Sequence, residues 1–175
     1  MKDYITGKEI DNVGSEASRQ IFEKFLVEKK GFTKEELLVD EPLIVQFKGE
    51  NYVSAIDLIV FCDDRPFMAV TCVAGSIGSY EREILAGARL VYEFPIPFAV
   101  STDGRDAVIM DTVSGKTISG KTFSGKSTAQ GIDALPSREE AENILAPIKN
   151  RIYDPNKIEG EMIIYRSFNL EKVNR

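Results

Sequence analysis

The stretch from residue 52 to residue 74, YVSAIDLIVFCDDRPFMAVTCVA, constrains the fold more than any other part of the sequence. Two apolar runs rich in β-branched residues flank a short polar turn that runs from Asp63 to Pro66. Apolar runs on both sides of a turn are typical of a β-hairpin, and strands this apolar are usually covered on both faces. We therefore expect this hairpin to lie at the centre of a sheet.

Asp57 interrupts the first of the two apolar runs. Burying a carboxylate is costly unless it is hydrogen-bonded, paired with a cation or bound to a metal. One interpretation is a structural aspartate, held by backbone N–H groups or by an arginine such as Arg19, Arg82 or Arg89. The other interpretation is a Mg²⁺ ligand, because hard cations prefer carboxylate oxygens.

The register of the hairpin indicates which residues should face Asp57. With a short loop, Asp57 lies opposite Thr71 or Val73, on the same side of the sheet. Neither residue carries a carboxylate, so the hairpin alone does not supply a second metal ligand.

The elements expected along the chain define the fold class. A helix from about Ser15 to Gly31 precedes a strand over residues 43–47 and the hairpin, which together make a three-strand meander. A second helix and two short strands, over 98–102 and 106–112, follow. A strand, a helix and a strand in succession imply a parallel crossover. We therefore predict an α/β fold with a mixed β-sheet, a β-meander plus a parallel crossover, flanked by α-helices.

The C-terminal part of the chain is predicted to be helical and separate from this sheet. A capping box at Ser137 favours a helix that continues to about Tyr153 and bends at Pro147, and a last amphipathic helix lies near residues 157–172. We assign residues 1–136 to the α/β core and residues 137–175 to a C-terminal helical extension packed on the same domain.

Composition excludes several kinds of chemistry. The 175 residues include no histidine, which excludes Ser-His-Asp and Cys-His catalysis and any zinc site with histidine ligands. The net charge of −6 disfavours a free-standing nucleic-acid binder. Two cysteines in apolar strands are expected to be buried thiols, which favours a cytoplasmic location, and no apolar run approaches the ~20 residues of a membrane span.

A repetitive stretch from Ser114 to Ser127 fits the two-glycine, lysine and Ser/Thr pattern of a phosphate-binding loop. Such a loop must lead from a buried strand directly into a helix, and no helix signal follows here, so we expect no nucleotide site. The repeat does place Lys116, Lys121 and Lys126 close together in the sequence. We take these three lysines as candidates for contact with a nucleic-acid backbone.

Several segments resemble a known family when they are taken in order. They are a first helix with Glu16 and Arg19, the strand AIDLIVF, a D-x-R-P turn, the strand FMAVTCVAG, the helix EREILAGARLV and the segments PFAVSTDGRDAVIMDT and ALPSREE. The order resembles the PD-(D/E)XK nuclease core, and most closely the N-terminal nuclease domain of type I restriction enzyme R subunits. The resemblance covers roughly residues 14–140.

This resemblance implies a restriction-endonuclease-like fold and a set of site residues. In the family, the Asp of the first hairpin strand binds Mg²⁺, and the second strand carries Glu-x-Lys, a metal ligand and a lysine that positions the attacking water. Asp57 matches the Asp, but Thr71 and Val73 occupy the Glu and Lys positions. The resemblance also implies DNA and restriction-modification subunits as partners.

Three interpretations follow. The first is a nuclease-fold domain with a degenerate site that binds nucleic acid weakly or serves in interactions. The second is an active Mg²⁺-dependent endonuclease in which Asp57 works with a migrated carboxylate, Glu83 or Glu41. Glu16 on the first helix is a further candidate catalytic residue. The third is a protein-binding domain without a nucleic-acid role.

Overall fold

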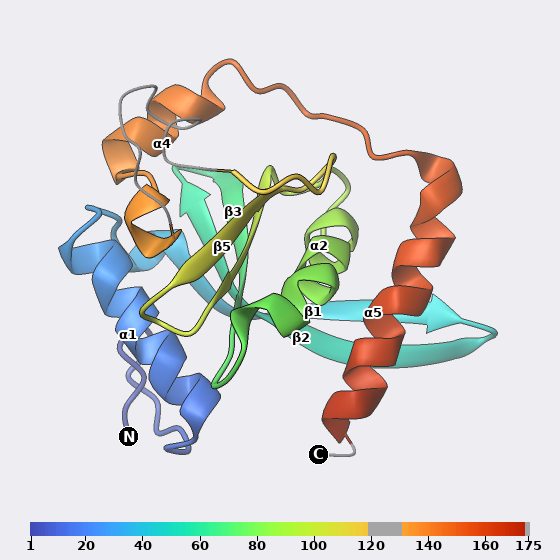
Figure 1. Ribbon diagram of the computed structural model, residues 1–175, viewed down its shortest axis with the longest axis horizontal. Helices are drawn as coiled ribbons and strands as arrows, with labels where there is room; N and C mark the ends of the chain where they lie inside the picture. The colour runs from blue at the N-terminus through green and yellow to red at the C-terminus, as the bar shows by residue number, and fades with distance from the viewer. Residues whose placement is uncertain (119–130, 174–175) are drawn as a thin grey trace.

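A five-stranded mixed sheet forms the centre of the protein, in the order β1-β2-β3-β4-β5. The computed structural model describes residues 1–118 and 131–173 (Figure 1). The strands are β1 (Leu37–Phe47), β2 (Glu50–Cys62), β3 (Arg65–Cys72), β4 (Phe98–Thr102) and β5 (Ala107–Asp111). The predicted α/β class is therefore confirmed.

The first three strands form the predicted meander. β1 and β2 pair antiparallel along most of their length, and β2 and β3 pair antiparallel across a tight turn in which Asp63 adopts φ 56°. A register shift between Val60 and Phe61 marks a bulge in β2. Pro42 lies in β1, at the edge of the sheet, where a missing backbone N–H costs the ladder little.

The parallel crossover begins after β3. The short 3₁₀ helix η2 (Ile77–Tyr80) leads directly into helix α2 (Glu81–Leu90), and β4 then pairs parallel with β3. β5 returns antiparallel to β4 across the turn at Gly104, which adopts φ 91°. Both pairings agree with the strand–helix–strand order seen in the sequence.

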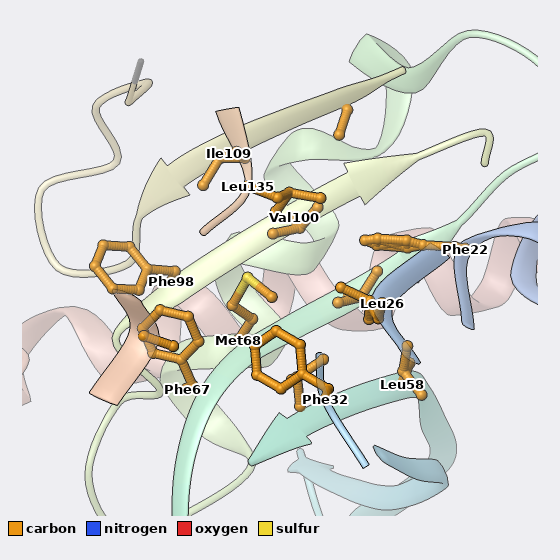
Figure 2. Close-up of a cluster of buried hydrophobic side chains, with 14 of the residues drawn as sticks. Phe22, Leu26, Phe32, Leu58, Phe67, Met68, Phe98, Val100, Ile109 and Leu135 are labelled. Atoms are coloured by element: carbon orange, nitrogen blue, oxygen red, sulfur yellow. The ribbon is translucent and has the colours of Figure 1, made fainter. Parts of the chain in front are cut away.

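Helices cover both faces of the sheet (Figure 1). On one face α1 (Gly14–Glu28) and α4 (Arg138–Leu145) pack over side chains from alternate strand positions, such as Leu58 and Val100. Figure 2 shows this cluster, in which Phe22 and Leu26 of α1 meet the aromatic and aliphatic side chains of β2 to β5. On the other face α2 and α5 (Ile158–Val173) cover the intervening positions, such as Ile59 and Ala99. The alternation explains why both hairpin strands are apolar throughout.

The C-terminal segment spans both faces of the sheet. α4 ends at Leu145, and an extended segment then crosses the end of the sheet to the 3₁₀ helix η4 (Pro155–Lys157) and α5 (Figure 1). The prediction of a bent helix from Ser137 to about Tyr153 is therefore wrong. Pro147 has no backbone N–H to donate and its ring clashes with the preceding turn, so the helix stops before it. Across residues 1–118 and 131–173, no helix combines the length and the apolar character that a membrane crossing requires.

Candidate functional site

Asp57 lies where the β2–β3 ladder comes to an end. The last paired residues are Leu58 and Val70, and beyond them the two strands diverge. The Asp57 carboxylate takes the place of a strand partner: its Oδ2 accepts the backbone N–H of Cys72 at 2.8 Å and the hydroxyl of Thr71 at 3.3 Å. The predicted register is confirmed, and the backbone N–H expected for a structural aspartate is present.

A cavity of about 650 Å³ opens beside this carboxylate. It lies between the start of α1, the β2–β3 hairpin, η2 and the C-terminal half of α5, so the two ends of the described chain both contribute to it. The residues that line it are Ser15, Asp57, Thr71, Cys72, Val73, Ala74, Gly75, Ser76, Ser79, Tyr80 and Phe168.

Gly14 allows α1 to start this close to the end of β3. A Cβ atom at position 14 would lie 2.6 Å from the Cβ of Ala74, which is closer than carbon atoms can approach. The absence of a side chain at Gly14 therefore sets the width of the cavity at this point, and it brings Ser15 to the cavity wall.

Thr71 and Val73 stand where the resemblance places a glutamate and a lysine. Thr71 is 5% exposed and donates its hydroxyl to Asp57, and Val73 is 6% exposed and donates its backbone N–H to the carbonyl of Thr102. Both line the cavity. Thr71 can offer a metal only a neutral hydroxyl, and Val73 has no side-chain donor that could orient a water.

The carboxylates considered as replacements lie elsewhere. Glu83 is buried on α2 at 3% exposure, and Glu41 accepts the Tyr92 hydroxyl at 3.2 Å. Glu16 is bound by Arg19, whose other nitrogen contacts Asp3 and Glu23. Glu83, Glu41 and Glu16 all fall outside the lining of the Asp57 cavity.

The other two arginines considered as partners of Asp57 bind a glutamate of α5 instead. Arg82 and Arg89 both bind Glu161, at 2.6 Å and 2.9 Å. Their role is to hold α5 against α2, which brings Phe168 of α5 to the cavity.

The donor set fits Mg²⁺ poorly. Throughout the described parts of the chain, no three Asp, Glu, Cys or His side chains lie close enough together to hold a metal ion. Asp57 is the one carboxylate that lines the cavity among the described residues. A resident Mg²⁺ usually needs one or two protein carboxylates together with substrate phosphate, and here it would have to rely on Asp57 alone.

Asp40 is a residue near the site that sequence reasoning missed. It falls between the pairs Val39–Leu58 and Glu41–Ile56, opposite Asp57, and adopts φ 56°. Partial burial, together with the nearby Glu16 and Asp3 carboxylates, raises the pKa of Asp40 against the opposing charge of Arg19. An aspartate tolerates this backbone conformation better than most residues, but the sequence gives no signal for it within an apolar strand.

The thiol of Cys72 belongs to the buried hydrophobic cluster that α1 covers, and it is protonated. Complete burial, and then the charge of Asp57, raise the pKa of Cys72 well above its ordinary value. Reactive cysteines need an electropositive setting that lowers the pKa, so the cavity does not activate this thiol as a nucleophile.

Of the three lysines predicted to contact a nucleic acid, Lys116 lies among the described residues. Lys116 is exposed just after β5, and its backbone carbonyl accepts the N–H of Asp111. Lys121 and Lys126 lie outside the described residues, as does most of the Ser114–Ser127 repeat.

Comparison with known proteins agrees with this architecture. A solved fragment of a protein assigned as the HsdR subunit of a type I restriction enzyme from Vibrio vulnificus YJ016 matches with a TM-score of 0.55 and 15% identity. The match covers 90% of this chain and 32% of the solved chain, so this chain spans about a third of the length of that solved fragment. At this identity the likeness shows the fold alone. No curated protein matches the sequence.

A comparison of the sequence with models of protein families identifies the family. The model of the type I restriction enzyme R protein N terminus (HSDR_N) matches residues 14–135, from the first residue of α1 to the end of η3 and the buried Leu135. The matched segment contains the whole sheet, including Asp57 and the other strand residues that line the cavity. The chain therefore belongs to the family of type I restriction enzyme R protein N-terminal domains.

Proposed function

We propose that this chain is a nuclease-fold domain of the R-subunit type that has lost metal-dependent hydrolysis and acts in binding or interaction, in a DNA-related role. One observation carries the proposal: Asp57, Thr71 and Val73 share a cavity wall, in the positions where the PD-(D/E)XK resemblance expects Asp, Glu and Lys. The scaffold that would present the catalytic groups is in place, while two of those groups are replaced.

The chemistry explains why these replacements matter. Metal-assisted phosphodiester hydrolysis requires a held cation and an oriented water. Thr71 cannot neutralise a cation, and its hydroxyl is used by Asp57 at 3.3 Å. The aliphatic side chain of Val73 cannot donate a hydrogen bond to a water. It also cannot stabilise the negative charge that develops on the phosphate oxygens in the transition state.

A plasmid-nicking assay with Mg²⁺ and, separately, Mn²⁺ tests the loss of hydrolysis. We expect no cleavage above that of buffer for the full chain. Asp57→Ala serves as the matched control for contaminating nucleases. Nicking by the wild-type chain that disappears in Asp57→Ala would overturn the proposal in favour of an active enzyme with a migrated carboxylate, and Glu83→Gln and Glu41→Gln would then identify that carboxylate.

The DNA-related role is tested by salt-dependent DNA binding. If Lys116, Lys121 and Lys126 contact phosphates, replacing all three by Gln should lower the slope of log affinity against log salt by about 3, since each phosphate contact contributes about 0.9 on duplex DNA. A slope that stays unchanged would remove these lysines from the interface. Absence of any DNA binding at low salt would favour a role in protein interaction alone, with DNA supplied by other restriction-modification subunits.

A further inference from the structure

A second cavity, of about 550 Å³, lies between α2 and α5. It shares no described lining residue with the Asp57 cavity, so the two are separate sites. Its volume is typical of a ligand site. We call it the α2–α5 cavity, and the residues of its wall that matter here are Arg82, Arg89, Gly115, Lys157, Gly160 and Glu161.

The charge of the α2–α5 cavity is opposite to that of the whole protein. Its described lining holds three basic side chains, Arg82, Arg89 and Lys157, and Glu161 as the one acidic side chain. The chain as a whole carries a net charge of −6. Asp154 and Glu159 flank the lining in sequence but lie outside it, where solvent screens their charge. The local excess of positive charge therefore attracts an anion into the cavity.

Arg89 supplies a cation that is already held in position. It is 9% exposed, and its Nε–H donates to the Thr112 carbonyl at 2.8 Å while Nη1 donates to Glu161 at 2.9 Å. The centre of its guanidinium lies 4.5 Å from the centroid of the Tyr153 ring. An anion that approaches Arg89 does not have to order a flexible side chain, which reduces the entropic cost of binding.

Arg82 and Lys157 add cations at the solvent side of the cavity. Two of the five N–H donors of Arg82 bind Glu161, at 2.8 Å and 2.6 Å, and its side chain is 41% exposed. The outer edge of this guanidinium can therefore donate to a second partner. Lys157 is exposed on η4 and lines the same cavity.

Gly160 leaves space in the wall of the cavity. It lies within α5, where glycine weakens a helix relative to alanine. A Cβ atom at this position would meet no described atom from the rest of the fold within 4 Å. Packing of the described residues therefore does not require a glycine here, and the missing side chain enlarges the room for a ligand.

A phosphate group suits these donors. Guanidinium groups bind phosphate oxygens through paired N–H donors, and a lysine ammonium adds a point charge. Lys116 is exposed and directly follows Gly115 of the cavity wall, so the positive charge continues beyond the cavity. A strand with successive phosphates can contact both places, whereas a single small anion can contact one. We propose that the α2–α5 cavity binds a backbone phosphate of a nucleic-acid strand.

This inference deepens the proposed function and rests on its DNA-related role, yet the two can fail separately. Duplex binding that ignores changes in the α2–α5 cavity overturns the choice of cavity and leaves the DNA-related role standing. Absence of duplex binding at low salt overturns both. Plasmid nicking that depends on Asp57 overturns the loss of hydrolysis alone.

Fluorescence anisotropy of the full chain with a short labelled DNA duplex, over a series of salt concentrations, provides the test. Lys157→Gln removes one exposed cation from the cavity. We expect the slope of log affinity against log salt to fall by about 0.9, the contribution of one phosphate contact on duplex DNA. Lys29→Gln removes the same charge from an exposed position at the end of α1, on the other face of the sheet, and should change the slope much less.

Gly160→Leu tests the same cavity without removing a charge. Leucine is a better helix former than glycine, so chemical denaturation should show no loss of stability. The leucine side chain fills the space beside Lys157 and Glu161, and duplex affinity should fall several-fold. Gly160→Ala, which strengthens the helix but adds only a methyl group, should weaken binding less.

Two outcomes would overturn the inference. One is a salt slope that Lys157→Gln and Lys29→Gln change equally, because the cavity lysine would then contribute only general charge. The other is a Gly160→Leu variant that is folded and binds the duplex as tightly as wild type, which would show that no phosphate enters the α2–α5 cavity.

Discussion

Two buried ionic clusters, one on each face of the sheet, have opposite charge balances. The cation-poor cluster lies on α1, where one arginine, Arg19, serves three carboxylates. Its nitrogens contact Asp3 at 2.7 Å, Glu23 at 3.0 Å and Glu16. Burial and the neighbouring Asp3 raise the pKa of Glu23 to about 8, against the opposing charge of Arg19.

The cation-rich cluster joins α5 to α2. One carboxylate, Glu161, accepts two bonds from Arg82 at 2.6 Å and 2.8 Å, one from Arg89 at 2.9 Å and one from the Tyr153 hydroxyl at 2.8 Å. Burial alone would raise the pKa of Glu161, but the bonds from Arg82 and Tyr153 and the charge of Arg89 outweigh it. The pKa of Glu161 is therefore lowered.

The comparison shows that the partners decide whether the effect of burial on the pKa of a glutamate prevails or is overcome. Glu23 and Glu161 are similarly inaccessible, at 0% and 3% exposure, yet their pKa values move in opposite directions. With one arginine for three carboxylates, burial and the repulsion from Asp3 prevail, and Glu23 binds a proton. With two arginines for one carboxylate, Glu161 keeps its charge. The two clusters should consequently respond to mutation and to pH in different ways.

The largest expected effect comes from removing the arginine of the cation-poor cluster. Arg19→Ala leaves the Asp3 carboxylate buried without a cation and should lower the free energy of unfolding at pH 7 by about 3–5 kcal/mol. Chemical denaturation measures this loss, with Lys24→Ala, an exposed position on the same helix, as control. A loss for Arg19→Ala that matched the control would show that protonation alone stabilises the cluster.

A somewhat smaller effect is expected from the cation-rich cluster. Glu161→Ala should cost about 3 kcal/mol, the lower end of the range for a broken buried pair. Arg82 is 41% exposed and can turn to water, and Arg89 keeps its bonds to the carbonyls of Thr112 and Val113. Glu159→Ala on the same helix is the exposed control. If Glu161→Ala proved more costly than Arg19→Ala, the ranking of the two clusters would be reversed.

The smallest effect, and the sharpest test of the comparison, is the pH dependence of stability. Glu23 binds a proton in the folded protein up to about pH 8, while in the unfolded chain it ionises near its ordinary value of 4.5. The folded state therefore binds more protons over this interval, and the contribution of Glu23 to stability declines as pH rises through it. Glu161 behaves in the opposite sense, and its contribution declines as pH falls below its ordinary value.

Glu23→Gln removes this titration. The variant should gain stability relative to wild type as pH rises from 5 to 8, with little difference between the two proteins near pH 5. Urea denaturation across this pH range measures the difference. Parallel stability curves for the two proteins would contradict the raised pKa of Glu23.

The central hairpin and its register were predictable because local rules determine both. A short turn between two apolar runs fixes which residues face each other, so the neighbourhood of Asp57 and Thr71 followed from counting along the strands. The parallel crossover followed similarly from the order of β3, α2 and β4. The Asp57 site was found through the cost of placing a charge in an apolar strand.

The rest depends on contacts that local patterns do not encode. No pattern in residues 1–13 indicates a structural role, yet Asp3 is 3% exposed and pairs with Arg19. Periodicity shows which face of a helix is apolar but not where that face docks, so the contribution of Phe168 to the cavity was not predictable. Pro147 was read as a bend, whereas it lies beyond the end of α4, because a proline can mark either.

The docking of α5 has a practical consequence for where this protein can be divided. The family model matches residues up to 135, but Glu161 and Phe168 lie beyond that boundary. A shortened chain that stopped at residue 135 would leave Arg89 without its carboxylate and the apolar face of α2 without its cover. The segment that must be expressed together is therefore longer than the segment that sequence comparison delimits.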